Sequence, residues 1–140
     1  KALIKVCSFR LSANNAMQHA YAKGLSEQGA NAHEYAAYLK LLKERAEYAT
    51  KRLNEMRGVR CVAPRGAFYA FPQVVEKGPW KSDKEFILQL LEEEGVRVVN
   101  GSGFGMKPAD VFFRVVTLPG IEVQDEAYTL MDKFMRRHLH

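Results

Sequence analysis

The chain has 140 residues, of which 47% are hydrophobic and 26% are charged, and this composition excludes a disordered or fibrous protein. Its net charge of +5 permits nucleic-acid binding, but acidic and basic residues alternate, so we favour a solvated mixed surface and expect no nucleic-acid partner. The apolar runs are too short to cross a bilayer and the first residues lack a signal-peptide core, so we expect no membrane partner.

The sulfur and imidazole side chains form no recognisable disulfide or metal pattern. Cys7 and Cys61 are interpreted as reduced, buried side chains of a cytoplasmic protein, because two cysteines make no disulfide framework. The histidines show neither HExxH nor Cys/His spacing, so we expect no metal. They are His19, His33, His138 and His140.

Residues 1–30 predict a helical segment that lies outside the domain pattern of the later residues. Ser12 can cap a helix that runs to about Leu25, with small side chains along one face. The chain opens on Lys1, without a methionine, in what reads as the middle of an element. We therefore expect that the chain is a fragment, and that residues 1–30 trail from a preceding domain.

A long second helix is predicted after a short polar connection. Asn31 and Glu34 have the spacing of a capping box, and Gly58 is a good helix stop. Between them, apolar side chains recur at alternating intervals of four and three residues: Tyr35, Leu39, Leu42, Ala46, Ala49, Leu53 and Met56. This stripe suits a coiled coil or packing across a sheet, and its two alanines favour the sheet because they make a shallow seam.

The remaining elements alternate between strands and helices. Strands are predicted at 59–63, 67–74, 96–100 and 111–117, and helices from the Ser82/Glu85 capping box to Glu94 and from about Glu122 to His138. The helix residues expected to turn inward are Phe86, Ile87, Leu90, Leu91, Val123, Ala127, Leu130, Met131 and Phe134. The order α-β-β-α-β-β-α from residue 33 predicts an α+β domain, residues 31–140, with helices on one face of a short sheet.

Arg114 is the most informative single residue, because it lies in the middle of the predicted strand VFFRVVT. Its neighbours on the same face are Phe112 and Val116, so the guanidinium needs an anionic partner. A salt bridge to an acid of this chain and an external carboxylate or phosphate held by two hydrogen bonds are equally good explanations on sequence alone.

Two further motifs have several interpretations. NGSGFG, residues 100–105, is a weak match to a phosphate loop because no helix or GK[ST] follows, and it is either a tight loop near a ligand or a plain turn. RGAFYAF, residues 65–71, fits an RNA-recognition strand only at its first two residues and Tyr69, so the RNA interpretation is rejected. Its alternation predicts a strand whose aromatic residues mostly serve the core.

Three motifs in order resemble the C-terminal part of class I aminotransferases, which are pyridoxal-phosphate enzymes of the aspartate aminotransferase fold. They are PRGAFYAFP (64–72), GSGFG (101–105) and FRVVTLP (113–119). The last is most similar to alanine (glutamate–pyruvate) aminotransferases, and aspartate-type members are also similar. The resemblance implies that residues 1–30 join a large domain to the small domain at 31–140, and that the whole enzyme is a homodimer.

The resemblance also implies roles for individual residues. Arg114 matches the arginine that binds the substrate α-carboxylate during amino transfer between alanine or aspartate and 2-oxoglutarate. An active-site entrance loop would include Gly66, Gly101, Ser102 and Phe104. Asn100 replaces a usual proline, and Gly120 replaces an expected acidic cap. A carbon–sulfur lyase or an aminocyclopropane-carboxylate synthase-like enzyme would keep the same arginine.

The lysine that holds the cofactor in this family lies in an S-K-x-x-x-x-G-x-R segment, which this sequence does not contain. The residues that bind the cofactor phosphate and pyridine nitrogen belong to the large domain. We therefore predict that this chain alone neither catalyses transamination nor binds pyridoxal phosphate well. The alternative from a different class is a stand-alone binding or dimerisation module that uses the heptad helix.

Overall fold

The computed structural model describes residues 3–5, 14–26 and 32–139, and it divides the chain into two compact units, Lys1–Leu39 and Lys40–His140. In the first unit, helix α2 (Asn15–Ser26) begins where the Asn14 side-chain oxygen accepts a hydrogen bond from the Met17 amide at 3.2 Å. The predicted caps Ser12 and Asn31 lie outside the described residues. No residue of α2 is buried within the described chain.

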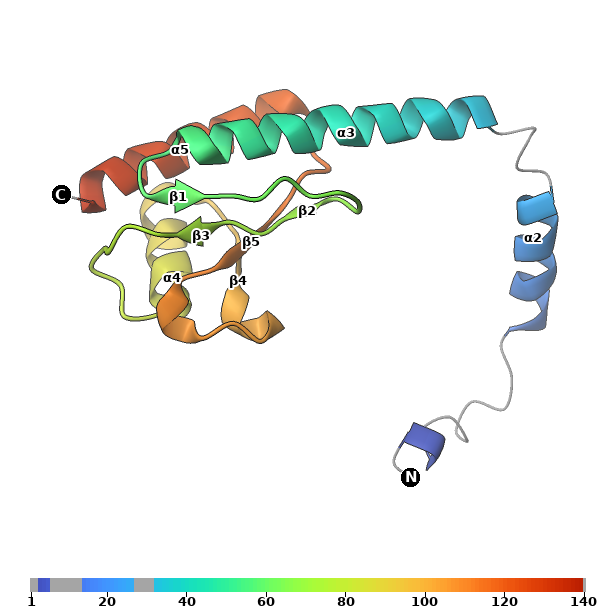
Figure 1. Cartoon of the computed structure of the whole chain (residues 1–140), viewed down its shortest axis with the longest axis horizontal. Helices are drawn as coiled ribbons and strands as arrows, with labels where there is room; N and C mark the ends of the chain where they lie inside the picture. The colour runs from blue at the N-terminus through green and yellow to red at the C-terminus, as the bar shows by residue number, and fades with distance from the viewer. Residues whose placement is uncertain (1–2, 6–13, 27–31, 140) are drawn as a thin grey trace. The chain divides into compact units, whose positions relative to one another are not determined.

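The predicted long helix is α3 (Ala32–Glu55), and its apolar stripe is buried only in the second half (Figure 1). Ala49, Leu53 and the following Met56 lie in the core, whereas Tyr35 and Leu39 are exposed. On the exposed side of the helix, lysines pair with glutamates four residues later, as in Lys40–Glu44 and its neighbours. The second half of the stripe therefore packs in the domain core. This agrees with the prediction that the helix packs across a sheet rather than in a coiled coil.

Within the described residues, five short antiparallel strands form a two-stranded and a three-stranded sheet: β1 (Val59–Arg60), β2 (Tyr69–Ala70), β3 (Gln73–Val74), β4 (Val99–Asn100) and β5 (Phe113–Val116). β5 lies between β2 and β4, and β1 pairs with β3. An isolated bridge between Gln73 and Phe112 connects the two pairings. The strand β5 is thus the centre around which the domain is built (Figure 1).

The predicted strand 67–74 is divided into β2 and β3, although one register runs through both. Tyr69 pairs with Val116 and Gln73 with Phe112, so Phe71 stands opposite Arg114. The ladder is interrupted at Pro72 because proline has no N–H to donate, and its carbonyl still accepts from the Phe113 amide at 3.0 Å. The predicted start at Ala67 is wrong, since Ala67 has a φ of 57° and is not extended.

The other strands are also shorter than predicted, and β1 shows the reason most clearly. The Asn54 side chain accepts a hydrogen bond from the Cys61 amide and donates one to the Cys61 carbonyl, both at 2.9 Å. Because both backbone groups of Cys61 are satisfied by a side chain of α3, the strand ends at Arg60. Cys61 is buried and free, as predicted, and burial raises the pKa of its thiol. Cys7 lies outside the described residues.

Helices α4 (Asp83–Glu94) and α5 (Ile121–His138) have nearly the predicted bounds. Ser82 caps α4 by accepting from the Glu85 amide at 3.3 Å, and Gly95 ends it in the left-handed region at φ 69°. Gly120 begins α5 without a side-chain cap, and Gln124 donates instead to the Pro119 carbonyl at 2.9 Å.

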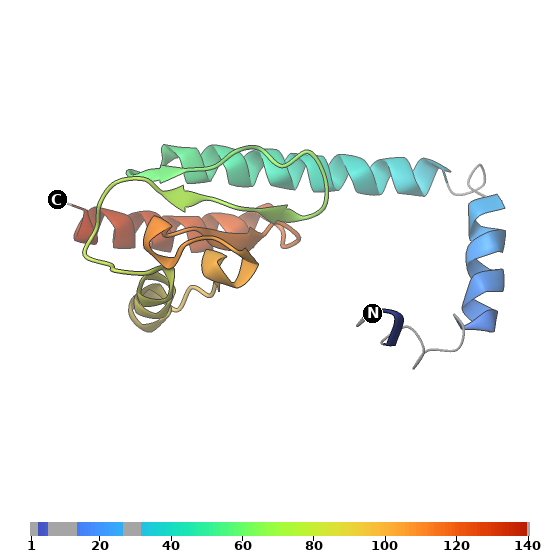
Figure 2. The same ribbon diagram turned by 60° about the horizontal axis from the view of Figure 1, so that its bottom comes forward.

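Helices α3, α4 and α5, which are drawn in Figures 1 and 2, all contribute to one buried cluster that includes Phe113 and Val115 of β5. The inward assignments of Phe86, Leu90, Met131 and Phe134 are confirmed. Those of Leu91 and Val123 are wrong, since Leu91 is exposed and Val123 is 58% exposed. The first half of α5 buries Gln124 and Tyr128 instead of Val123, which lies beside a surface cavity.

Helices α3 and α5 run side by side in the same direction, because their contacts advance together along both. The Tyr48 hydroxyl donates to Asp125 at 2.5 Å, and further along the Arg57 guanidinium donates to the Leu139 carbonyl at 3.2 Å. The hydrogen bond from Tyr48, followed by the charge of Arg52, holds the pKa of Asp125 below its ordinary value.

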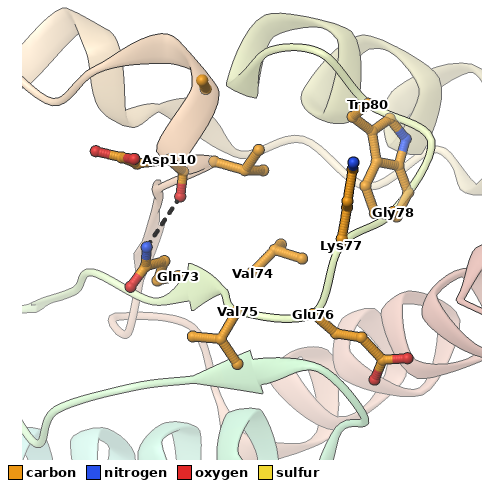
Figure 3. Close-up of a pocket in the computed structure, with 10 residues that line it drawn as sticks. Gln73, Val74, Val75, Glu76, Lys77, Gly78, Trp80 and Asp110 are labelled. Atoms are coloured by element: carbon orange, nitrogen blue, oxygen red, sulfur yellow. Dashed lines mark hydrogen bonds between the residues drawn. The ribbon is translucent and has the colours of Figure 1, made fainter.

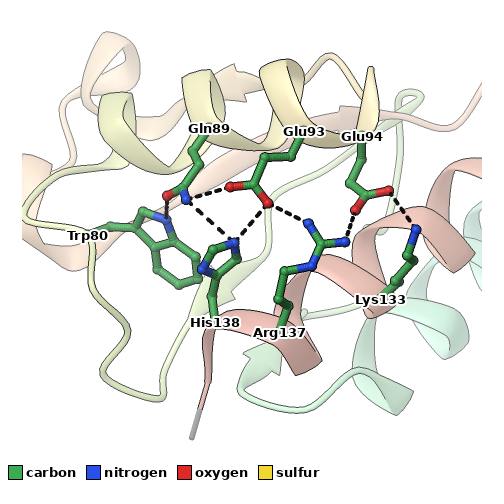
Figure 4. Close-up of polar contacts among 7 residues, drawn as sticks. All are labelled: Trp80, Gln89, Glu93, Glu94, Lys133, Arg137 and His138. Carbon is green, nitrogen blue, oxygen red and sulfur yellow. Dashed lines mark hydrogen bonds and ion pairs between the residues drawn. The ribbon is translucent and has the colours of Figure 1, made fainter.

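A network of charges joins the C-terminal ends of α4 and α5 (Figure 4). Arg137 donates to Glu93 at 2.6 Å and to Glu94 at 2.5 Å, and His138 Nε2 donates to Glu93 at 2.9 Å. The hydrogen bond with His138, and then that with Gln89, lowers the pKa of Glu93 from 4.5 to about 2. The chain's own acids therefore satisfy this arginine.

Candidate carboxylate site on the open face of the sheet

Arg114 lies on the face of β5 opposite the helices. No ion pair or hydrogen bond joins its side chain to another described residue, and its Nε is buried without a partner. Within the described part of the chain, the explanation by an internal salt bridge therefore finds no acid. A buried donor without an acceptor is costly, so the guanidinium is suited to a partner from outside these residues.

The rings of Tyr69 and Phe104 lie against the Arg114 guanidinium, each with its centroid 4.4 Å from Cζ. Aromatic faces attract the cation by about 0.5–2 kcal/mol but accept few of its N–H groups. The rings therefore hold the side chain while leaving its hydrogen-bond donors available. A planar guanidinium in this state can bind a carboxylate through two parallel hydrogen bonds.

The aromatic residues of RGAFYAF contribute to this face more than to the core, so their assignment to the core is wrong. Ala70 is the buried residue of β2, while Tyr69 contacts Arg114. The Phe71 ring stacks on Phe112 at 5.6 Å and meets the edge of Phe104 at 5.9 Å. The core lies on the other side of the strand, so alternation turns these rings to the face that carries Arg114. Arg65 is exposed.

The glycine-rich segment is a tight turn, the 3-10 helix η1 (Gly101–Phe104), which approaches β5 closely. The Gly101 amide donates to the Phe112 carbonyl at 2.7 Å, and a Cβ at Gly101 would come within 2.4 Å of the Phe112 Cβ. Gly101 is therefore required for this approach. By contrast, a Cβ at Gly66 would meet no atom within 4 Å. The structure brings Phe104 to Arg114 and Gly101 to the neighbouring Phe112, and it shows no such close packing for Gly66.

Polar contacts hold the turn from behind. The Ser102 backbone amide donates to Asp83 Oδ2 at 2.5 Å. The Ser102 hydroxyl accepts a hydrogen bond from the side-chain Nδ2 of Asn100 at 2.7 Å. Asn100 has a φ of −65°, which is the angle that the usual proline would impose. Sequence reasoning did not identify Asp83 or the pairing of Tyr69 with Arg114, because an acid in the first turn of a helix is ordinary.

Two cavities flank the sheet. One, of about 210 Å³, lies between the start of α5 and strands β4 and β5, and it is lined by apolar side chains with Arg97 and Arg114. The other, of about 440 Å³, lies between β3, Lys77, Trp80 and η2 (Pro108–Asp110), where Gln73 donates to the Asp110 carbonyl at 3.2 Å (Figure 3). Of these two cavities, the first has Arg114 in its lining, together with helix-side residues such as Tyr128 and Met131.

The described residues contain no group of His, Cys, Asp and Glu side chains that could hold a metal ion. Among the same residues, no helix is both long and apolar enough to cross a bilayer. The chemical groups that meet at Arg114 are its own cation and the aromatic rings of Tyr69 and Phe104. This arrangement suits recognition of an anionic group next to an apolar one.

Residues 1–129 match the family aminotransferase class I and II, and the chain belongs to this family. It is 37% identical over 132 residues to the glutamate-pyruvate aminotransferase AlaA of Haemophilus influenzae, covering 93% of this chain and 32% of that protein. It is 39% identical over 90 residues to an aspartate aminotransferase of Bacillus subtilis, covering 62% of this chain and 22% of that protein.

Solved structures agree with this assignment. An alanine aminotransferase from Pyrococcus furiosus matches 73% of this chain with 25% of its own length, at a TM-score of 0.68 and 49% identity. The chain contains both helices and strands, as the α+β prediction requires, and it aligns to part of an aminotransferase structure. The chain spans about a third or less of the length of these relatives.

The family depends on pyridoxal phosphate. The side chains that lie against Arg114 (those of Tyr69 and Phe104) include no lysine that could hold this cofactor. The turn η1 is a 3-10 helix that leads to η2 and β5, and not to an α-helix whose N-terminus could hold a phosphate. The surroundings of Arg114 therefore suit a carboxylate group.

Proposed function

We propose that this chain is the C-terminal part of a pyridoxal-phosphate-dependent aminotransferase that exchanges amino groups between alanine or aspartate and 2-oxoglutarate. In this proposal, residues 31–140 are the small domain of the aspartate aminotransferase fold, and residues 1–30 join it to the large domain. Arg114 binds the substrate α-carboxylate, and an entrance loop includes Gly66, Gly101, Ser102 and Phe104. The complete protein is a cytoplasmic homodimer.

The observation that carries the proposal is the state of the Arg114 guanidinium. It has two aromatic rings against it at 4.4 Å, a buried Nε without an acceptor, and no acid partner among the described residues. Every amino-acid and 2-oxo-acid substrate of a transaminase carries a carboxylate, which matches these donors in shape and charge. The match of residues 1–129 to the aminotransferase family gives that carboxylate its chemical context.

The direct test is an amino-transfer assay on the complete polypeptide that carries this chain. With 2-oxoglutarate as acceptor, we expect glutamate to form when alanine or aspartate is the donor. Absence of glutamate with both donors would contradict the proposal. Release of ammonia without any acceptor would instead identify a lyase of the same fold. Gel filtration of the complete protein is expected to give the mass of a dimer.

The 140-residue chain alone is expected to be inactive, since the sequence lacks the S-K-x-x-x-x-G-x-R segment. The same assay on the isolated chain, together with an absorbance spectrum after addition of pyridoxal phosphate, tests this. Amino transfer, or the absorbance of a lysine-bound cofactor, would contradict it.

A further inference from the structure

Asp83, the first residue of α4, is a fully buried carboxylate to which the proposed reaction gives no role. It is 0% exposed, its Oδ2 accepts the Ser102 amide at 2.5 Å, and its Oδ1 is buried without a hydrogen-bond partner among the described residues. Burying a carboxylate is costly unless its hydrogen bonds and nearby dipoles compensate. At this position the N-terminal end of the α4 dipole and the Ser102 amide supply that compensation.

The hydrogen bond from Ser102 connects α4 to the turn that carries Phe104. Gly101 at the start of η1 is held to Phe112, and the Gly105 amide closes the turn on the Ser102 carbonyl at 3.3 Å. Asp83 holds the segment between these two contacts. At the end of the same turn, the Phe104 ring, itself 48% exposed, lies 4.4 Å from the Arg114 guanidinium.

We propose that Asp83 is a positioning residue for the Arg114 carboxylate site: it fixes the turn η1 and thereby keeps the Phe104 ring against the guanidinium. The inference rests on the proposed function and adds to it a residue that never touches the substrate. It explains why a buried acid is placed at the start of α4, where its own neighbour Ser82 already caps the helix.

Loss of Asp83 would make the turn η1 and the Phe104 ring less ordered, and it would remove no contact with the substrate. Without the hydrogen bond from Ser102, the turn keeps its contacts with Phe112 and Asn100 but is no longer attached to Asp83 of α4, and Phe104 can leave the guanidinium. Arg114 then has to be ordered when a carboxylate binds, and this cost weakens binding. Because the reacting atoms are elsewhere, the KM values for both substrates rise while kcat changes much less.

The test compares three variants of the complete enzyme. Asp83→Ala is expected to raise the KM for the amino acid and for 2-oxoglutarate about tenfold, the usual effect of one charge-assisted hydrogen bond, with kcat within about threefold. Asp83→Asn keeps an acceptor for the Ser102 amide and is expected to restore most of the affinity. Ser82→Ala is the matched control, since it weakens the same helix end but leaves the Asp83–Ser102 contact in place. Equal KM changes in Asp83→Ala and Ser82→Ala would overturn the inference.

A double-mutant cycle with Phe104→Leu separates positioning from general destabilisation. If Asp83 acts through the Phe104 ring, the KM effect of Asp83→Ala largely disappears in the Phe104→Leu background. If the two effects on KM simply multiply, Asp83 acts on the fold and the inference fails.

Amide hydrogen exchange of the segment 101–105 in the complete protein gives a readout that needs no activity. Exchange at this segment is expected to speed up about tenfold or more in Asp83→Ala and to stay unchanged in Ser82→Ala. Unchanged exchange in Asp83→Ala overturns the inference even if the enzyme is an active transaminase. A wild-type protein without transaminase activity refutes the proposed function instead, and the exchange result still decides whether Asp83 fixes the turn.

Discussion

The two faces of strand β5 differ in how far their side chains are buried and in whether nearby charges find a partner within this chain. On the inner face, Phe113 is 0% exposed within the helix-covered core, and nearby on those helices Arg137 is paired with Glu93 and Glu94. On the outer face, Val116 is 42% exposed and Arg114 has no acid partner among the described residues. Arg137 is thus paired with acids of this chain, whereas Arg114 has no acid partner among the described residues. The difference separates the residues that hold the fold from those that we propose bind a ligand.

The largest expected effect tests whether the inner face carries the stability. Phe113→Ala removes a fully buried ring and should cost about 3–5 kcal/mol of unfolding free energy. Val116→Ala, on the outer face of the same strand, should cost less than about 1 kcal/mol. Urea unfolding followed by fluorescence of Trp80, the single tryptophan, measures both. Similar losses in the two variants would erase the distinction between the faces.

The next prediction tests whether the outer face carries the binding. Arg114→Lys replaces a planar donor by a point charge, so kcat/KM of the complete enzyme should fall roughly 100-fold. Because Arg114 has no ion pair among the described residues, the unfolding free energy should change by less than about 1 kcal/mol. Arg97→Lys, at an exposed position beside the same cavity, is the control and should keep its activity. An equal loss in both variants would argue against a specific role for Arg114.

Gly101 lies where the turn η1 meets β5, and its substitution should have an intermediate effect. A methyl group there would come within 2.4 Å of the Phe112 Cβ and 2.8 Å of its carbonyl oxygen. Gly101→Ala should therefore cost about 1–3 kcal/mol and disturb the turn. At Gly103 in the same turn, the nearest atom to a Cβ is 3.7 Å away, so Gly103→Ala should be tolerated. Denaturant midpoints of the two variants decide this, and a tolerated Gly101→Ala would contradict the close approach.

The smallest expected effect concerns Glu93, which is paired with Arg137 and His138 at the C-terminal ends of α4 and α5. Contacts with His138 and Gln89 lower the pKa of Glu93 from 4.5 to about 2, so between these values the unfolded chain binds the proton more readily than the folded one. This contribution to stability is complete above pH 4.5 and is lost as the pH falls toward 2. Glu93→Gln should therefore flatten the acid limb of the stability curve, whereas Glu126→Gln, at an exposed position of α5, should leave it unchanged. Acid limbs that coincide for wild type and Glu93→Gln would contradict the assignment.

Local chemistry accounts for what the sequence predicted well. Ser82 and Gly95 set the ends of α4 because capping depends on residues within a few positions, and the burial of Phe86 and Leu90 follows from helical periodicity. The strand lengths were predicted less well. The Asn54 side chain of α3 ends β1, which the strand's own sequence does not show, whereas the division of the predicted strand 67–74 at Pro72 has a local cause, the missing N–H of proline. Val123 was expected inside by periodicity, but the core contacts the neighbouring face of α5 that carries Gln124 and Tyr128.

For the candidate site, the sequence by itself predicted that Arg114 needs an anionic partner, because an arginine with apolar neighbours on a central strand is costly to leave unpaired. It also carried the motifs by which the chain resembles its family. Only the tertiary structure decided which residues surround that arginine. Tyr69, Phe104 and Asp83 come from three different elements, and their contacts depend on the register of β2 with β5 and on the packing of η1 against α4. Such contacts are set by the folding of distant segments onto one another, and no local pattern in the chain encodes them.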